Sequence, residues 1–425
     1  MSLSSSLYSG ISGLNANTNA MSVIGNNIAN ANTSGFKSGR ANFSDVISQS
    51  LSSGSNPNQI GRGAQISSIS NSFTQGSLES TSSATDLALE GDGFFIVNDG
   101  LSSYYTRAGQ FSADKNRNLV NTDGLTVQGW DSDSNGNPTG AIKDINFANA
   151  SATPQVTSSV TLNANLDSRE TIAGAFNLAD PAGTSNFSSG LTVYDSLGNA
   201  HTVICYFSKT AANAWDWNAV VDGSELTSGL TEIEASGTLS FTTSGELDTE
   251  TTTVSDFNFA GGSALNQVIN FDFGDSLTTD GGTGLSGSTQ FGADSAVSLL
   301  DQDGFTSGTL QSISVDQDGI ITGFFTNGKT QPLAIVAVAT FQNQGGLNKV
   351  GSNLFSETFA TGQPVITMGG VGGSGKVQSN SLEQSNVDLA EEFVKMITTQ
   401  RAFQANSRTI TTTDEMMAEI INIKR

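Results

Sequence analysis

The chain has 425 residues, 40 acidic against 17 basic side chains, and a formal net charge of −23. This balance excludes nucleic-acid binding, because neutralising phosphate requires clustered Lys and Arg that the sequence does not contain, and it also argues against binding to an anionic membrane surface. The length predicts two to four domains with real cores.

Residues 3–28 predict a long helix, because their apolar residues recur at alternating steps of three and four. The mean step of 3.5 is typical of a coiled-coil seam, which Thr18 interrupts. The seam consists of Leu3, Leu7, Ile11, Leu14, Met21, Ile24 and Ile28. Residues 1–36 contain no charged side chain and no His. A face of Ser and Asn therefore favours close packing against protein, or the lining of a channel.

After this helix, Gly35 provides the left-handed conformation that ends a helix or turns the chain. Residues 31–85, rich in Ser, Asn, Gly and Gln, predict a connector. Its apolar residues are too regular for a pure linker, so partial order against a neighbouring element is expected.

From residue 86 the pattern becomes β, with strands rich in Val, Ile, Phe and Tyr. Asp-Gly or Asn-Gly pairs recur at 123–124, 135–136, 303–304, 318–319 and 327–328. Such pairs favour type I′ hairpins, because both central residues tolerate positive φ. We therefore expect an antiparallel inner β domain of residues 86–150 plus 301–354.

Residues 151–300 predict an outer β domain with 17 acidic and two basic residues, a net charge of −15. So acidic a block is expected to be exposed and self-repelling. Cys205, the only cysteine, lies in an apolar strand and is expected to be a buried structural thiol. Phe94, Phe95, Trp130, Trp215 and Trp217 are expected to lie in the cores.

The last segment repeats the helical pattern, with Gln400, Ser407 and Asp414 interrupting its seam. Its apolar positions are Leu389, Phe393, Met396, Phe403, Ile410, Met417 and Ile421. Residues 1–30 and 385–425 are thus predicted to form a helical coiled-coil domain, joined to the β domains by connectors at 31–85 and 355–384. The expected fold is mainly β, with two nested antiparallel β domains between paired terminal helices. An ordinary contact within one subunit is the alternative, but the uncharged face of residues 1–36 favours assembly between copies, so the seam residues of both helices are predicted to form the assembly interface.

Other classes of function find little support. His201, the only histidine, is expected at a strand edge in a surface or capping role, and no catalytic pair, phosphate loop or zinc spacing is present. Residues 131–136 resemble half of a calcium loop, but Ile142 stands where a bidentate Glu is needed, so a hairpin turn is the better interpretation. No catalytic, cofactor or metal site is predicted. Neither a transmembrane stretch nor a cleavable signal is expected.

Several motifs resemble the bacterial flagellar rod and hook family. The N-terminal motif comprises Asn27, Ala29, Asn30, Thr33, Gly35, Phe36 and Lys37, and a β-domain motif comprises Gly91, Asp92, Gly93, Phe94 and Phe95. Residues 105–111, 118–120 and 129–130 resemble further parts of that β domain, and residues 386–406 resemble the terminal helix of the family. The insertion at 150–300 resembles hook members, because rod members are shorter and lack it.

The resemblance implies an extracellular subunit of the bacterial flagellum, attached to the basal body, that is neither an enzyme nor inserted in a membrane. Such subunits polymerise into a curved hollow tube that serves as a universal joint from rod to filament in motility. The implied partners are further copies of the chain, a hook-capping scaffold protein, the distal rod protein, hook–filament junction proteins and the type III export apparatus. A distal rod-type axial protein is the alternative.

Overall fold

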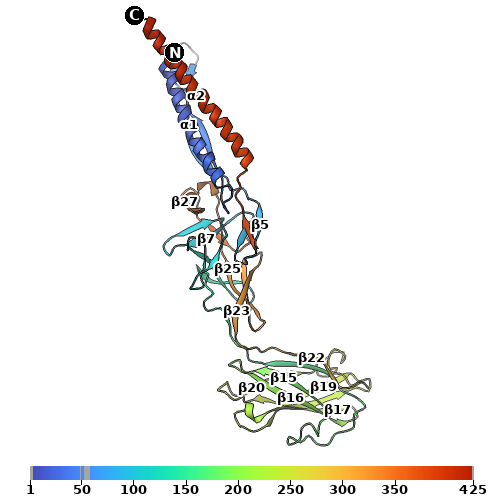
Figure 1. Ribbon diagram of the computed structural model, residues 1–425. Helices are drawn as coiled ribbons and strands as arrows, with labels where there is room; N and C mark the ends of the chain where they lie inside the picture. Colours follow the sequence, from blue (N-terminus) through green and yellow to red (C-terminus); the bar gives the residue numbers. More distant parts are fainter. Residues whose placement is uncertain (1–2, 48, 52–57, 424–425) are drawn as a thin grey trace. The chain divides into compact units, whose positions relative to one another are not determined.

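The computed structural model describes residues 3–47, 49–51 and 58–423, which form two compact units (Figure 1). One unit holds both chain ends and comprises residues 1–150, 312–324 and 330–425. The other, called here the outer unit, comprises residues 151–311 and 325–329. The finer division into connectors and domains made from the sequence stays a prediction.

The two terminal helices, α1 (Leu3–Ala29) and α2 (Leu389–Ile423), pack along one another (Figure 1). The Oδ1 atom of Asp388 accepts the backbone N–H groups of Ala390 and Glu391, at 2.8 and 3.2 Å, and so caps the start of α2. The prediction of a mainly β chain with paired terminal helices is confirmed. In the part of the chain that the structure describes, neither helix has the length and apolar character needed to cross a membrane.

The segment after α1 is a β-hairpin that lies against that helix. Strands β1 (Gly39–Asp45) and β4 (Ala64–Asn71) pair antiparallel, and the N–H of Ala64 donates to the Ser12 hydroxyl of α1 at 3.3 Å. The hairpin continues through β2 (Gln49–Leu51) and β3 (Asn58–Ile60). The partial order expected here is therefore a regular hairpin.

The next strands pair with segments from near the end of the chain. Strand β5 (Leu78–Ser80) pairs with β31 (Ser381–Glu383), and β6 (Leu87–Glu90) pairs with β30 (Lys376–Ser379). These two pairings bring the chain back to the foot of α2.

The central sheet of this unit is built around β7 (Phe94–Asn98), which pairs with β8 (Ser103–Thr106), β11 (Thr126–Ser132) and β26 (Val338–Thr340). Strand β11 also pairs with β25 (Thr330–Val336). The other strands are β9 (Ser112–Ala113), β10 (Leu119–Val120), β12 (Pro138–Asp144), β24 (Ile320–Phe325), β27 (Asn348–Gly351), β28 (Leu354–Ser356) and β29 (Val365–Thr367). Phe94, Tyr105, Phe341 and Phe355 meet edge to face in the core.

The outer unit contains two sheets around a separate core. The first sheet runs β15-β16-β17-β18-β19-β20 and the second β21-β14-β22. The bounds are β13 (Ser151–Ala152), β14 (Ser159–Asn165), β15 (Phe187–Tyr194), β16 (Ala200–Ala211), β17 (Ala214–Val221), β18 (Glu232–Phe241), β19 (Leu247–Phe257), β20 (Gln267–Val268), β21 (Asn270–Asp272) and β22 (Ala296–Gln302), with a short helix η1 (Gly223–Glu225). Strand β23 (Gly308–Val315) begins in the outer unit and ends in the other unit. Strands β14 and β21 are parallel, which departs from the antiparallel expectation.

The predicted core aromatics lie inside, except that Trp130 is only partly buried. Trp215 and Trp217 have no exposed surface, nor does Cys205, and burial raises the pKa of that thiol to about 12. His201 was expected near the surface and that expectation is wrong. Its ring is 7% exposed, stacks on Phe259 at 4.1 Å, and lies 3.2 Å from carboxylates of both Asp195 and Glu225.

The turns also differ from the type I′ prediction. At 133–137, only Gly136 has positive φ, and the Asp133 carboxylate accepts the N–H groups of Asn135 and Asn137 at 2.9 and 2.8 Å. The same side-chain bonding recurs around Asp114, Asn121, Asp195 and Asp316. Because the side-chain oxygen of the first Asp or Asn accepts backbone N–H groups of the turn, the turn needs only one residue with left-handed backbone conformation. Gly351, Ser352 and Asn353 are by contrast three successive residues with positive φ.

Two glutamates of the acidic block are shielded from solvent to different degrees, since Glu234 is buried and Glu250 is half-buried. Glu234 of β18, at a bulge opposite β17, is 6% exposed. Burial, with the nearby charges of Glu232 and Asp256, raises its pKa to about 7. Burial likewise raises the pKa of Glu250 to about 7, although the Phe273 N–H donates to its carboxylate at 3.0 Å.

The outer unit should therefore lose stability as pH rises. A carboxyl whose pKa is raised on folding stabilises the folded state below its ordinary value of 4.5, and this contribution is lost as pH rises through about 7. Urea unfolding followed by the fluorescence of Trp215 and Trp217 should show a falling midpoint between pH 5 and pH 8.

The double substitution E234Q/E250Q should flatten this dependence. Asp301→Asn, which removes an exposed carboxylate on β22 of the same unit, is the control and should leave the slope as in the unaltered chain. Equal slopes for all three proteins would refute the role of the buried pair.

Candidate functional site: paired terminal helices

The side of α1 that meets α2 is lined by small residues. A Cβ added to Gly10 would lie 2.9 Å from Cγ1 of Ile410, and one added to Gly13 would lie 2.6 Å from Nδ2 of Asn406. Further along the same line, Ala16, Ala20, Ile24 and Asn27 are all buried. Glycine and alanine at these steps allow the two helices to approach closely.

The apolar seam predicted on α1 is thus not the line of closest contact. Of the predicted residues Leu7, Ile11, Leu14, Met21, Ile24 and Ile28, only Ile24 is buried, and Ile11 is 39% exposed. The side chain of Leu3 lies outside the described residues. The steps from Gly10 to Gly13, Ala16 and Ala20 were the signal that could have located the contact, and they carry little weight in a hydrophobic pattern.

On α2 the predicted seam divides into two groups. Met396, Phe403, Ile410 and Met417 are half-buried and repeat every seven residues, in line with the contact at Ile410. Glu392, Thr399, Asn406 and Thr413 complete this face, with Glu392 and Thr413 fully buried. By contrast, Leu389, Phe393 and Ile421 are 43%, 50% and 67% exposed. The sequence pattern combined residues that meet α1 with residues that do not.

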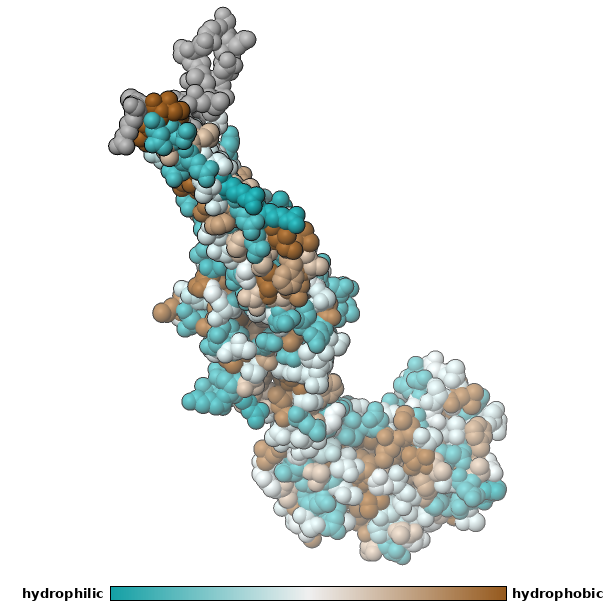
Figure 2. Space-filling view, turned by 45° about the horizontal axis from the view of Figure 1, so that its top comes forward, coloured by the Kyte–Doolittle hydropathy of each residue, from teal (hydrophilic) through white to brown (hydrophobic). Residues whose placement is uncertain are grey.

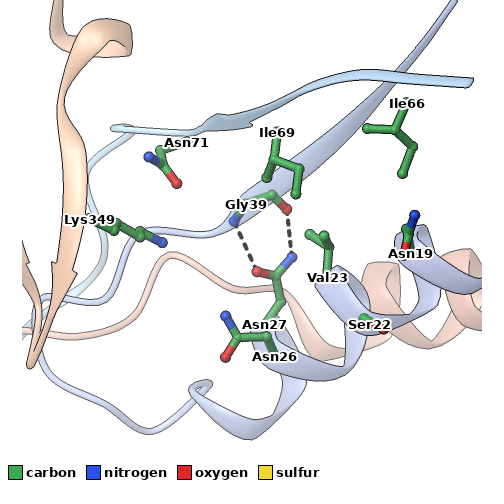
Figure 3. A pocket seen from close by; sticks show the side chains of 10 residues that line it. All are labelled: Asn19, Ser22, Val23, Asn26, Asn27, Gly39, Ile66, Ile69, Asn71 and Lys349. Atoms are coloured by element: carbon green, nitrogen blue, oxygen red, sulfur yellow. Dashed lines mark hydrogen bonds between the residues drawn. The ribbon is translucent and has the colours of Figure 1, made fainter.

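Asn27 ties both helices to the hairpin. Its side-chain amide donates to the carbonyl of Gly39 at 2.8 Å and accepts the Gly39 N–H at 2.9 Å (Figure 3). The same Nδ2 donates to Oε2 of Glu392 at 3.2 Å. Lys395 donates to the other oxygen of Glu392 at 2.8 Å, so this buried carboxylate is partnered on both sides. Asn27 therefore fixes the register between α1, β1 and α2.

A pocket of about 370 Å³ opens beside this contact (Figure 3). Its lining comes from α1, from the β1–β4 hairpin and from β27: Asn19, Ser22, Val23, Asn26, Asn27, Gly39, Ile66, Ile69, Asn71 and Lys349. Nine of these ten side chains are uncharged, and the one cation, Lys349, donates to the carbonyl of Lys37 at 2.7 Å. The pocket offers no titratable pair for acid–base chemistry.

Beneath the helices lies a buried ionic cluster of three residues. The Lys37 ammonium is 2.6 Å from Oε1 of Glu383, and the Arg107 guanidinium is 3.4 Å from its Oε2. The Glu383 and Lys37 side chains are 0% exposed and Arg107 is 1% exposed. Lys37 also donates to the carbonyl of Thr74 and Arg107 to that of Gly91, both at 2.8 Å. We call this set the Glu383 cluster.

Burial lowers the pKa of both cations in the Glu383 cluster, and the charge of Glu383 opposes that lowering in each case. Two cations share one anion, and Phe94 lies 5.3 Å from the Arg107 guanidinium and provides its π face. The cluster joins three parts of the chain that are more than 60 residues apart in sequence. Its chemistry is structural, because all three side chains are at most 1% exposed to solvent.

Residues of the N-terminal motif lead directly into this cluster. Asn30, Thr33 and Ala29 form the turn that ends α1, with the Asn30 amide donating to the Asn26 carbonyl at 2.8 Å. Gly35 has φ +69°, and an added Cβ would lie 2.4 Å from the backbone N of Ala108. Its N–H donates to the carbonyl of Glu383 at 2.7 Å. Phe36 is buried beneath the Lys349 ammonium, 4.6 Å from its ring centre.

The β-domain motif lies on the other side of the cluster. Gly91, Asp92 and Gly93 form the turn between β6 and β7, where Gly91 and Gly93 have φ of +113° and +134°. Phe94 and Phe95 follow as fully buried strand residues. Sequence reasoning assigned no role to Arg107 and did not single out Glu383, because a lone Glu beside a Leu gives no sign of burial.

Comparisons with known proteins agree over the whole length. Four family models match: "Flagella basal body rod protein" at 7–37, "Flagellar hook protein FlgE/F/G D1 domain" at 88–165, "Flagellar basal body protein FlaE D2 domain" at 165–305 and "Flagellar basal body rod FlgEFG protein C-terminal" at 378–423. The flagellar hook protein FlgE of Borreliella burgdorferi is 38% identical over 99% of both chains. The chain belongs to the flagellar hook protein FlgE family.

Two further relatives extend this result. FlgE of Treponema pallidum is 36% identical over 99% of each chain, and FlgE of Salmonella typhimurium is 34% identical over 97% of this chain and 98% of that one. The sequence-based identification of a hook protein is thereby confirmed. Placed on the structure, the two terminal family matches contain Lys37 and Glu383, and the D1 match contains Arg107. The Glu383 cluster therefore connects three of the four family segments.

Removing the anion of the Glu383 cluster should destabilise this hook protein severely. Glu383→Gln leaves Lys37 and Arg107 buried without a counter-charge, which costs roughly 3–5 kcal/mol when a buried ion pair is broken. The free energy of unfolding, measured by urea titration followed by circular dichroism, should fall by about that amount.

The matched control is Asp131→Asn, which breaks an ion pair of equal length between exposed partners. The Lys143–Asp131 distance is 2.6 Å, and the two side chains are 58% and 55% exposed. Solvent screens such pairs, so the unfolding midpoint should barely change. Equal losses in both variants would contradict the importance of burial at Glu383.

Proposed function

We propose that this hook protein polymerises through its paired terminal helices into a curved hollow tube that works as a universal joint between rod and filament. The observation that carries the proposal is the apolar surface left on the helices. In α2, Leu389, Phe393, Val394, Ile397, Met416, Ile420, Ile421 and Ile423 are each at least 43% exposed. Figure 2 shows hydrophobic side chains reaching the surface along the helical part of the chain.

Such a surface is larger than isolated apolar residues on a soluble protein require, and it indicates a partner. A second copy of the same chain is the partner that we propose for this surface. Heterologous contacts whose rotation does not close produce an open helical filament, which is the form that a tube needs. The uncharged face of α1 is compatible with close packing in the same assembly.

The contact within one subunit supports the same conclusion. Glycine, alanine, Asn406 and Thr413 at the α1–α2 contact bury little apolar area, so the pair gains only modest stability alone. Assembly would add the missing burial. We infer that order in both ends increases when copies associate, which would keep exported chains from polymerising early.

The proposal includes the further partners implied by membership in the family. These are the distal rod protein, the hook-capping scaffold, the hook–filament junction proteins and the type III export apparatus, with the hook lying outside the cell. A rod-type role, the alternative weighed from the sequence, has less support because residues 165–305 match a hook-type D2 model and fold around their own core.

Polymerisation should depend on exposed apolar residues of α2 rather than on its exposed polar ones. Met416 and Ile420 are 50% and 53% exposed, so M416E/I420E should leave the subunit folded and abolish tubes. Purified protein would be concentrated in ammonium sulfate and viewed by negative-stain electron microscopy.

The matched control is Q404E/T411E, which changes the net charge by the same amount at two exposed polar positions of α2. It should form tubes as the unaltered chain does, and thermal unfolding should be alike for all three proteins. Normal tubes from M416E/I420E would refute assembly through this surface.

A further inference from the structure

A groove lies between the two helices and the β1–β4 hairpin. It has a volume of about 280 Å³. Its apolar lining comes from Ala20, Val23 and Ile24 of α1 and from Ala41 and Phe43 of β1, and the rest of its lining is Gly39, Arg40, Glu392, Lys395, Thr398 and Thr399. Phe43 is 51% exposed, so an aromatic wall of the groove faces solvent.

A different face of the same part of α2 carries an apolar ridge. Leu389 and Phe393 are four residues apart and therefore neighbours on one helix face. Phe393 is two residues from Lys395 of the groove, and two residues span about 200° around an α-helix. Glu392, which also lines the groove, is about 100° from Phe393, so the ridge and the groove lie on different faces of one helix, at the same level along it.

Two complementary surfaces placed in this way cannot meet within one chain. They meet when a second copy lies beside the first in the same orientation, which is the heterologous contact that an open assembly requires. We propose that the ridge of Leu389 and Phe393 inserts into the groove of a neighbouring copy, with Phe393 against Phe43. This inference rests on the proposed polymer and specifies how its copies meet.

The charges around the two surfaces are complementary. Arg40, at the edge of the groove, is exposed and has no ion-pair partner among the residues that the structure describes. The ridge begins next to Asp388, an exposed carboxylate at the first turn of α2. Lys395 is already partnered by Glu391 and Glu392 at 3.0 and 2.8 Å, which leaves Arg40 as the cation available to a neighbour.

Aromatic side chains suit this contact energetically. A buried Phe contributes a large apolar area, and edge-to-face aromatic pairs add stabilisation beyond that area. Anchors of this kind, set in a pocket with a polar rim, carry most of the binding energy at protein interfaces. Val394 is 61% exposed and projects about 100° away from Phe393, so it is not part of the ridge, although it is the helical neighbour of Thr398 at the edge of the groove.

The contact can be tested by cross-linking between two different variants of the full chain. One carries Phe393→Cys and the other Ala41→Cys; the native Cys205 is fully buried and its raised pKa keeps the thiol unreactive. Mixed tubes would be oxidised with copper phenanthroline and run on a non-reducing gel. We expect a covalent dimer from this mixture and none from V394C mixed with A41C.

A second experiment measures how strongly the contact stabilises the tube. Phe393→Ala should raise the critical concentration for tube formation about tenfold or more, as loss of an interface anchor does, whereas Val394→Ala should change it less than about twofold. Tubes that form normally in F393A, or that cross-link through V394C instead of F393C, would overturn this contact and leave the polymer proposal standing. If the unaltered chain forms no oligomer, both proposals are overturned.

Discussion

The fold of the unit that holds both chain ends depends on one buried carboxylate. Glu383 binds Lys37 and Arg107, and each cation would be unstable in that position without it. The three groups leave water together or not at all, so the return of the chain from α1, its entry into the β domain and its path to α2 form cooperatively. Asn27 provides a second link of this kind, in which a neutral amide joins Gly39 of β1 to Glu392 of α2. The end of α1 and the start of α2 are thus held in place by these contacts.

Periodicity in the sequence predicted the elements well and their faces poorly. Apolar residues that recur every three or four positions identified both helices, and alternating β-formers with Gly-containing turns identified the β domains. The contact face of α1 was missed because Gly10, Gly13, Ala16 and Ala20 add almost nothing to a hydrophobic stripe although they decide how closely helices approach. The Glu383 cluster was missed because burial of a charge depends on partners far away in sequence. Turn type was missed because Asx side chains replaced a second left-handed residue.

The acidic outer unit shows that net charge and burial are separate properties. Its excess of carboxylates indicated an exposed, repelling surface, yet Glu234 is buried and Glu250 is half-buried, both with raised pKa values. His201 between Asp195 and Glu225 departs in the same way, since an inward position on β16 and stacking on Phe259 bury it. Whether such a side chain is buried depends on the face of the sheet to which it points. A shift of one residue in register, or one bulge, reverses that face.

Two kinds of contact on α2 explain how one sequence serves both subunit and assembly. Its inward face meets small and polar residues, which fix register with little apolar burial, while its larger apolar side chains, Phe393 and Ile397 among them, stay at the surface. A tighter pairing within the subunit would use these side chains and leave nothing for a neighbour. Under the proposed polymerisation, weak packing between α1 and α2 leaves the larger apolar side chains of α2 available to a neighbouring copy. The predicted seam combined both faces because a coiled-coil pattern records apolar spacing and not the identity of the partner.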